Sequence, residues 1–226
     1  MRYSLPCGPG ALAVITTAAA PGPFEHCGAV ELTRAAQIHS DIVLESAAPG
    51  VIGEGDAVIT REAALAPAVL TADCVPVLIA SESGTVRAAT HAGRKGLQSR
   101  IITKTIERLR ERTGEPLWAL IGPHICARCY EVPAELQEEV ARERDEARAT
   151  TSWGTPGLNL TAMARRELAD GGVCNVEVDV PTEQWCTLEN EAWWSYRRDG
   201  TSRRITSALL IDDTPSPLPP GAQNHP

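Results

Sequence analysis

The chain has 226 residues, and its formal net charge of −8 at pH 7 disfavours a general affinity for nucleic acid or anionic membranes. Hydrophobic residues make up 43% of the sequence and aromatic residues only 4%, so the core must be built mainly from aliphatic side chains. A chain of this length buries roughly 70% of its unfolded surface and needs no disulfide to fold. We predict one globular domain over residues 1–212, followed by a disordered proline-rich tail over 213–226.

The cysteines indicate a reducing compartment. Seven of them, at positions 7, 27, 74, 126, 129, 174 and 186, are too scattered for a secreted disulfide framework. The apolar run at 10–20 resembles a signal peptide, but prolines precede it closely and only Arg2 supplies positive charge. No apolar stretch reaches the length of a membrane-spanning helix. These features predict a cytoplasmic protein with reduced thiols.

Short β-type runs alternate with helical runs along the chain. Strands are predicted at 12–17, 42–44, 57–60, 68–70, 75–80, 86–90, 118–121, 176–180 and 207–211. Helices are predicted at 97–112, from one apolar stripe, at 133–149, as a charged surface helix, and at 159–169, capped by Asn159. This order predicts an α/β or α+β fold without the regular spacing of a doubly wound parallel sheet.

Three potential metal ligands are predicted at strand ends or tight turns, where functional side chains concentrate. His39 precedes a predicted strand, Cys74 lies between two apolar strands, and His91 ends a third. Two imidazoles and a thiolate suit Zn²⁺, and a fourth position left open is typical of a catalytic site. Asp73, beside the thiolate, is a candidate partner for a ligand imidazole. Two alternatives stay open: a merely buried Cys74, and a cysteine hydrolase in which a histidine activates Cys74 as nucleophile.

Two basic segments are candidates for binding an anion. Arg94 and Lys95 lie in the glycine-containing turn at 91–96, directly before the first predicted helix, whose free N–H groups favour anions. Arg197 and Arg198 belong to an arginine-rich loop that can face a substrate. The alternative for both segments is a plain turn or loop with solvated charges.

Cys126-Ala-Arg-Cys129 is a C-x-x-C motif without the context that would give it a function. No second cysteine pair follows at zinc-finger spacing, and no thioredoxin-type pattern surrounds it. We interpret these two cysteines as local packing, so neither a structural zinc site nor a redox role is predicted for them.

Several short motifs occur in an order that resembles a known family. They are Gln37-Ile-His39, Asp56-Ala-Val-Ile-Thr60, Leu70-Thr-Ala-Asp-Cys-Val-Pro-Val77, His91-Ala-Gly93 with Gly96, Gly122-Pro123 with Tyr130-Glu-Val132, Cys186-Thr187, and Ser195-Tyr-Arg-Arg198. Each motif is short, but the ordered set is similar to the laccase-domain family. That family is also called multicopper polyphenol oxidase, peptidoglycan editing factor and purine nucleoside phosphorylase.

The resemblance implies both a fold and a metal site. The fold would be a four-layer α/β/β/α sandwich with mixed sheets. The metal ligands would be His39, Cys74 and His91, the same three residues that the local pattern indicates. Zn²⁺ is the expected cofactor, with copper as an alternative occupant in vitro.

The resemblance also implies an activity, the phosphorolysis of purine nucleosides with adenosine deamination beside it. We assign catalytic roles to Asp73 and Cys74, and substrate or phosphate binding to Gln37, Arg94, Lys95, Arg197 and Arg198. The expected partners are a purine nucleoside and phosphate, with no nucleic acid and no membrane, and the expected state is a monomer. The laccase name does not fit, because five scattered histidines cannot supply a multicopper cluster.

The sequence departs from this family on its N-terminal side. The stretch between Thr17 and Gln37 is shorter than usual. At 18–21 this chain has Ala-Ala-Ala-Pro, where the family has an arginine and a pair of glycines. Arg94-Lys95 stands where the family has Trp-Arg. The short segment predicts a more open pocket or a reduced phosphate site. It also supports two alternatives, a binding protein without catalysis and a member recruited to specialised metabolism with another small-molecule substrate.

Overall fold

The computed structural model describes residues 2–20, 26–27, 29–175 and 182–212. The predicted strand at 176–180 and the predicted tail at 213–226 lie outside these residues. Within the described residues, no helix combines the length and apolar character needed to cross a membrane.

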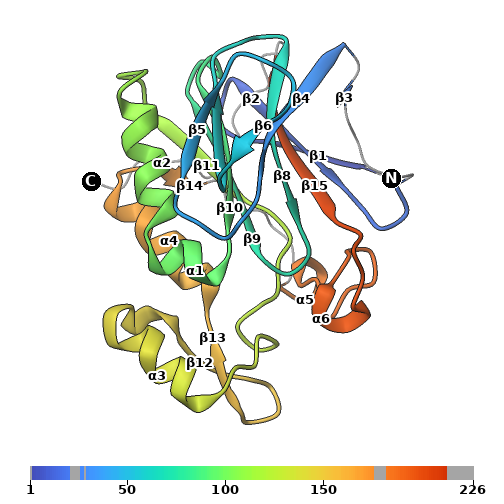
Figure 1. Cartoon of the computed structure of the whole chain (residues 1–226), viewed down its shortest axis with the longest axis vertical. Coiled ribbons are helices and arrows are strands. Elements are labelled where there is room, and N and C mark those ends of the chain that lie inside the picture. The colour runs from blue at the N-terminus through green and yellow to red at the C-terminus, as the bar shows by residue number, and fades with distance from the viewer. Residues whose placement is uncertain (1, 21–25, 28, 176–181, 213–226) are drawn as a thin grey trace.

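Two mixed β-sheets form the body of the fold (Figure 1). The seven-stranded sheet consists, in spatial order, of β1 (Arg2–Pro6), β2 (Ala11–Thr16), β15 (Ile205–Ile211), β8 (Leu65–Thr71), β4 (Val30–Ala36) and β3 (His26–Cys27), with β6 (Gly50–Glu54) also paired to β4. The six-stranded sheet consists of β14 (Cys174–Asn175), β11 (Leu117–Ile121), β9 (Val75–Ser81), β10 (Arg87–Ala92), β7 (Ala57–Thr60) and β5 (Val43–Ser46). Each sheet contains parallel and antiparallel pairs, which confirms the predicted α/β class with mixed sheets.

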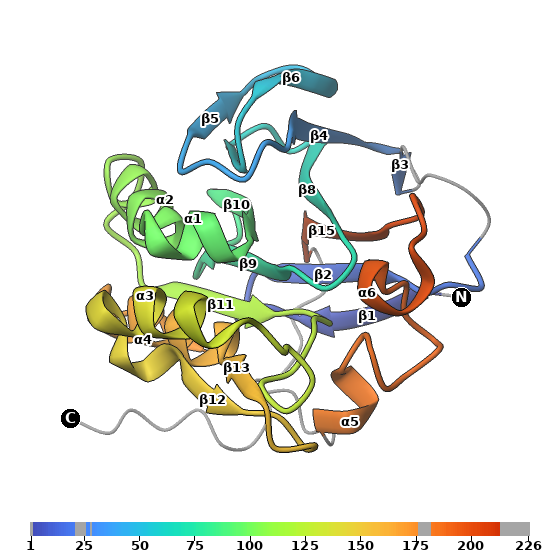
Figure 2. The same ribbon diagram turned by 60° about the horizontal axis from the view of Figure 1, so that its bottom comes forward.

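The helices lie outside the sheets. On the outer side of the six-stranded sheet are α1 (Arg94–Gln98), α2 (Ile101–Arg110) and α4 (Leu160–Asp170), as Figures 1 and 2 show. A smaller unit of α3 (Ala134–Glu143), the 3-10 turn η1 (Asp145–Ala147) and the hairpin of β12 (Arg148–Thr150) and β13 (Pro156–Leu158) extends below them. The short helices α5 (Thr182–Trp185) and α6 (Tyr196–Asp199) lie below β8 and β15.

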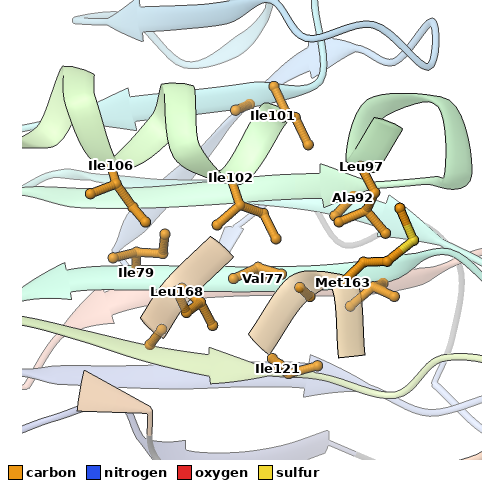
Figure 3. Close-up of a cluster of buried hydrophobic side chains, with 14 of the residues drawn as sticks. Val77, Ile79, Ala92, Leu97, Ile101, Ile102, Ile106, Ile121, Met163 and Leu168 are labelled. Atoms are coloured by element: carbon orange, nitrogen blue, oxygen red, sulfur yellow. The ribbon is translucent and has the colours of Figure 1, made fainter. Parts of the chain in front are cut away.

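The core is aliphatic, as the composition predicts, and strand β9 joins its two halves. Side chains alternate across a strand. Val77 and Ile79 therefore face α2 and α4, where they pack with residues such as Ile102 (Figure 3). Leu78 and Ala80 point the other way and pack against the seven-stranded sheet. Because both faces of β9 are buried, the ends of this strand are held rigidly, and one end carries the candidate site.

The predicted helix 97–112 is wrong in its start and its continuity. Helix begins at Arg94, and α1 and α2 are separated because Arg100 adopts a left-handed conformation with φ 62°. The Arg100 N–H bonds to the Leu97 carbonyl at 3.2 Å and closes α1. The apolar stripe runs through this break without interruption, so the periodicity did not reveal it.

The predicted helix 133–149 ends early for an electrostatic reason. Helix α3 stops at Glu143, and the chain turns through η1 into β12. Arg144 is 2% exposed, and its guanidinium donates to Glu167 at 3.0 Å and to the Leu97 carbonyl at 2.5 Å. A buried charge needs such partners, and reaching them turns the chain out of the helix. By contrast, the Asn159 cap of α4 is confirmed, because its Oδ1 accepts from the Ala162 N–H at 2.9 Å.

Candidate metal centre

The structure brings together the three residues that the sequence singles out as metal ligands. His39 lies in the turn after β4, Cys74 in the turn between β8 and β9, and His91 on β10. One ligand atom from each lies within 4.8 Å of the others. Cys74 Sγ is 3.9 Å from His39 Nε2, and the two imidazole rings stand nearly perpendicular with centroids 4.8 Å apart. His91 is buried, Cys74 half-buried and His39 exposed, so the cluster is open on one side.

Asp56, buried at the start of β7, organises this cluster. Its Oδ1 accepts from His91 Nδ1 at 2.7 Å and from the His39 N–H at 3.0 Å. Its Oδ2 accepts from the Ile38 N–H at 3.2 Å and from the N–H and Oγ of Ser40 at 2.6 and 2.7 Å. The carboxylate therefore holds the 38–40 turn, in which His39 has φ 61°, and orients the His91 ring through Nδ1, so that Nε2 is the nitrogen that a metal would bind. Burial opposes ionisation of Asp56, but these hydrogen bonds keep its pKa well below the usual range.

The thiol and the buried imidazole stabilise each other's charged forms. Burial disfavours the Cys74 thiolate, but hydrogen bonds from His39 and His91 outweigh it and lower the pKa of Cys74 to about 6. Burial likewise opposes protonation of His91, but Asp56 and Cys74 raise the pKa of this imidazole to about 9. The thiolate is the form that binds metals and acts as a nucleophile. The site therefore favours a reactive thiolate at neutral pH.

Gly93 allows the ligands to approach one another. A Cβ atom at this position would lie 3.0 Å from His39 Cδ2 and 3.3 Å from Cys74 Sγ. Its backbone angles, φ −72° and ψ 166°, are accessible to any residue, so the requirement for glycine is one of space.

A cavity of about 930 Å³ opens beside the cluster. Besides the three ligands, its lining includes the arginines Arg34, Arg197 and Arg204, the tyrosines Tyr130 and Tyr196, and the apolar residues Leu70, Ile125 and Leu160. No carboxylate in the described part of the chain pairs with the Arg34 guanidinium. Residues 21–25 and 28 lie outside the described part, so the predicted opening of the pocket by the short N-terminal segment stays a prediction.

Two predicted site residues line the cavity, but their polar groups are engaged elsewhere. The Gln37 amide donates to the Leu70 carbonyl and accepts from the Leu70 N–H, both at 2.8 Å. Asp73 is not the imidazole partner we predicted, a role that Asp56 fills. The Asp73 backbone has φ 89°, and its carboxylate accepts from Thr187 Oγ1 and the Arg197 N–H, both at 2.7 Å. Asp73 thus joins two loops beside Cys74.

The four predicted basic residues lie in different surroundings. Arg197 lines the cavity, with its guanidinium 5.0 Å from the Tyr130 ring centroid. Arg198 turns away and donates to carbonyl groups of the loop before it. Arg94 and Lys95 are absent from the described lining. Burial and the charge of Cys74 raise the pKa of the Tyr130 hydroxyl, and the positive charges of Arg94 and Arg197 partly oppose this rise.

Several cavity residues and the role of Asp56 were not predicted from the sequence. A carboxylate directly before a buried strand was a usable signal for Asp56, since it also belongs to one of the ordered motifs. Tyr130 and Tyr196 lie in two further motifs, but single tyrosines carry no signal of their neighbours. Arg34 lies on β4, which was not predicted as a strand, so no pattern in the sequence indicated that Arg34 lies at the site.

The architecture and the donor set define a two-sheet α/β sandwich with a candidate His₂Cys metal centre of the open type. The chain belongs to the multi-copper polyphenol oxidoreductase laccase family, whose family model matches residues 24–212. The family predicted from the ordered motifs is therefore confirmed.

Several curated relatives carry the name purine nucleoside phosphorylase. One from Streptomyces coelicolor, SCO2081, is 43% identical over 159 residues, which cover 70% of this chain and 64% of that protein. The match thus spans less than two thirds of that relative. Rv2149c from Mycobacterium tuberculosis is 35% identical over 180 residues (78% of this chain, 70% of the relative). YfiH from Escherichia coli is 33% identical over 178 residues (77% and 72%).

Solved structures share the fold. Protein NMB0706 from Neisseria meningitidis has a TM-score of 0.77 at 26% identity, covering 94% of this chain and 98% of that one. YlmD from Geobacillus stearothermophilus has a TM-score of 0.73 at 23% identity, covering 92% and 94%, and supports the fold alone.

Proposed function

We propose that this protein is a zinc-dependent purine nucleoside phosphorylase that acts at the centre formed by His39, Cys74 and His91. The observation that carries the proposal is the His₂Cys donor set opening onto a cavity with arginine and tyrosine side chains. The names of the relatives support the same reaction. Nitrogen and thiolate donors favour Zn²⁺, and three protein ligands leave a coordination position for water or substrate.

The cavity residues suit the two substrates. Tyr130 and Tyr196 supply aromatic rings for a purine to contact, each with an arginine over one face, Arg197 at 5.0 Å and Arg204 at 6.0 Å from the ring centroid. The guanidinium groups of Arg34 and Arg204 suit phosphate, since Arg binds phosphate oxygens with two parallel hydrogen bonds. Arg34 is half-buried, which strengthens its contact with an anion relative to one in open solvent.

In the proposed reaction, a phosphate oxygen attacks C1′ of the ribose while the bond from C1′ to the purine nitrogen breaks. A Zn²⁺ held by the three ligands would supply Lewis-acid charge for this step and a means of activating water for the accompanying adenosine deamination. Asp73 accepts two hydrogen bonds through its carboxylate. We therefore propose that it positions the loops that carry Thr187 and Arg197, in place of the catalytic role predicted from the sequence.

A cysteine hydrolase is the second candidate, and one observation favours it. Cys74 Sγ lies 3.9 Å from His39 Nε2, and the pKa of this thiol is lowered to about 6. Such a pair can act as nucleophile and base without a metal. Metal-free protein separates the two, because the hydrolase keeps its activity and the zinc enzyme loses it.

The activity is tested with inosine and adenosine, zinc-loaded protein, and buffers with and without phosphate. We expect base and ribose 1-phosphate by mass, and no activity in Cys74→Ala. Cys7→Ala is the control, because Cys7 is a thiol that lies between the sheets and outside the metal cluster. Release of free ribose at an equal rate in rigorously phosphate-free buffer would make the reaction a hydrolysis.

Variants test which basic groups bind phosphate. Loss of one charge-assisted contact of about 1.5–3 kcal/mol in Arg34→Ala should raise the phosphate KM by about tenfold or more. The predicted roles of Arg94 and Lys95 are tested by the double alanine variant. Because neither lines the cavity, we expect a smaller change in phosphate KM there, reduced further by salt. A larger increase in phosphate KM in the double variant than in Arg34→Ala would indicate that phosphate binds at the turn 91–96.

A further inference from the structure

A second cluster of metal-binding side chains lies outside the centre described above. Ligand atoms of Cys126, Cys129, Cys186 and Glu189 all lie within 4.8 Å of one another. The two cysteines of the C-x-x-C motif follow β11, whereas Cys186 follows α5, far along the chain. The three thiols are 4%, 2% and 1% exposed, and none is in a disulfide.

Polar contacts join three of the four members of this cluster. The Cys126 N–H donates to Cys186 Sγ at 3.4 Å, and Cys126 Sγ lies 3.8 Å from Glu189 Oε2. Ile125 and Leu188 pack against the thiols, while Glu189 lies on the exposed side of the cluster. The interpretation of the C-x-x-C motif as local packing therefore omits two donors, Cys186 and Glu189, which sequence spacing did not connect to it.

We propose that Cys126, Cys129, Cys186 and Glu189 hold a structural Zn²⁺. Three thiolates and one carboxylate would supply four ligand atoms, the number that a structural zinc site uses. The guanidinium of Arg128, between the two cysteines of the motif, lies 3.4 Å from Glu189 Oε1 and also pairs with Glu183. This positive charge offsets the negative charge of a Cys₃Glu site.

The site joins two segments that form walls of the cavity. Next to Cys126, the Ile125 N–H donates to the Asp73 carbonyl at 3.0 Å. Next to Cys186, Thr187 Oγ1 donates to the Asp73 carboxylate at 2.7 Å. The first segment continues to Tyr130 and the second to Tyr196, both in the cavity lining. A metal at this cluster therefore acts as a clamp on both walls, while the reaction takes place at the other centre.

Zinc content of the full-length protein tests the clamp independently of activity. The wild type should bind about two zinc ions per chain, and Cys74→Ala and Cys129→Ser about one each. Cys174→Ser is the matched control, since Cys174 is half-buried and outside both clusters, and it should keep both ions. If the proposed catalytic centre binds no zinc, the wild type should bind one ion. That ion should then be retained in Cys74→Ala and lost in Cys129→Ser, which supports the clamp independently of the catalytic centre.

A second measurement does not depend on the folding of Cys129→Ser. Cobalt(II) added to metal-free Cys74→Ala should produce thiolate-to-cobalt charge-transfer absorption, because the remaining cluster supplies three thiolate donors. Absence of that absorption overturns the proposal. So does a disulfide between two of Cys126, Cys129 and Cys186, found by mass spectrometry of peptides from the wild-type protein.

Discussion

Replacing Asp56 by asparagine removes the charge that organises the candidate metal centre and leaves the volume unchanged. The carboxylate accepts five hydrogen bonds, two on Oδ1 and three on Oδ2. An amide nitrogen in place of either oxygen faces donors, so at least two donors lose their acceptor. At about 1–3 kcal/mol for each unsatisfied donor, Asp56→Asn should lower the free energy of unfolding by about 2–6 kcal/mol.

The same substitution should weaken zinc binding. Loss of the carboxylate partner of a ligand imidazole typically costs about 10–100-fold in metal affinity, or about 1.4–2.8 kcal/mol. Zinc dissociation constants from competition with a chromophoric chelator measure this effect, and urea unfolding of the metal-free protein measures the stability. Asp41→Asn is the control, because Asp41 forms a partly exposed ion pair with Lys104, a kind worth about 0–1 kcal/mol. Wild-type zinc affinity in Asp56→Asn would refute the role assigned to this carboxylate.

Three further variants test other parts of the structure. Gly93→Ala should weaken zinc binding several-fold, because the added Cβ would crowd His39 and the Cys74 thiol. Gly114→Ala is the control, because a Cβ there has no atom within 4 Å. Equal zinc affinities in the two variants would contradict the requirement for space at Gly93. Arg144→Ala leaves the Glu167 carboxylate buried without its partner and should cost about 3–5 kcal/mol in urea unfolding, and a loss below 1 kcal/mol would contradict the buried pair. Asn159→Ala removes the cap of α4 and should cost about 1 kcal/mol by the same measurement, an unchanged value speaking against the cap.

The sequence predicted several buried strands well because their patterns are local, whereas two of the three predicted helices had wrong bounds. Strand β7 has the predicted bounds, and β9 and β10 differ by one or two residues. Strand β4 was missed because Glu31, Thr33 and Arg34 interrupt its apolar residues, and its place in the sheet depends on pairing with β6 and β8. Such pairing is a property of the tertiary structure and leaves little trace in the strand's own sequence.

The same distinction explains the outcome at the two clusters. His39, Cys74 and His91 were predicted as one site because each stands beside a strand end or turn with a motif around it. Asp73 was chosen as the imidazole partner by its closeness in sequence, whereas Asp56 holds that place in space. Cys186 was not connected with the C-x-x-C motif because a parallel bridge between His124 and Cys186 brings it there.

The most direct test of the proposed function is product analysis of one adenosine reaction with zinc-loaded protein, in phosphate and in phosphate-free buffer, beside metal-free protein. The proposed centre predicts free purine base, counted as adenine plus the hypoxanthine that follows deamination, in the same amount as ribose 1-phosphate when zinc and phosphate are both present, and little free base when either is withdrawn. Adenine formed at the same rate without phosphate, or by metal-free protein, would contradict a zinc-dependent phosphorylase.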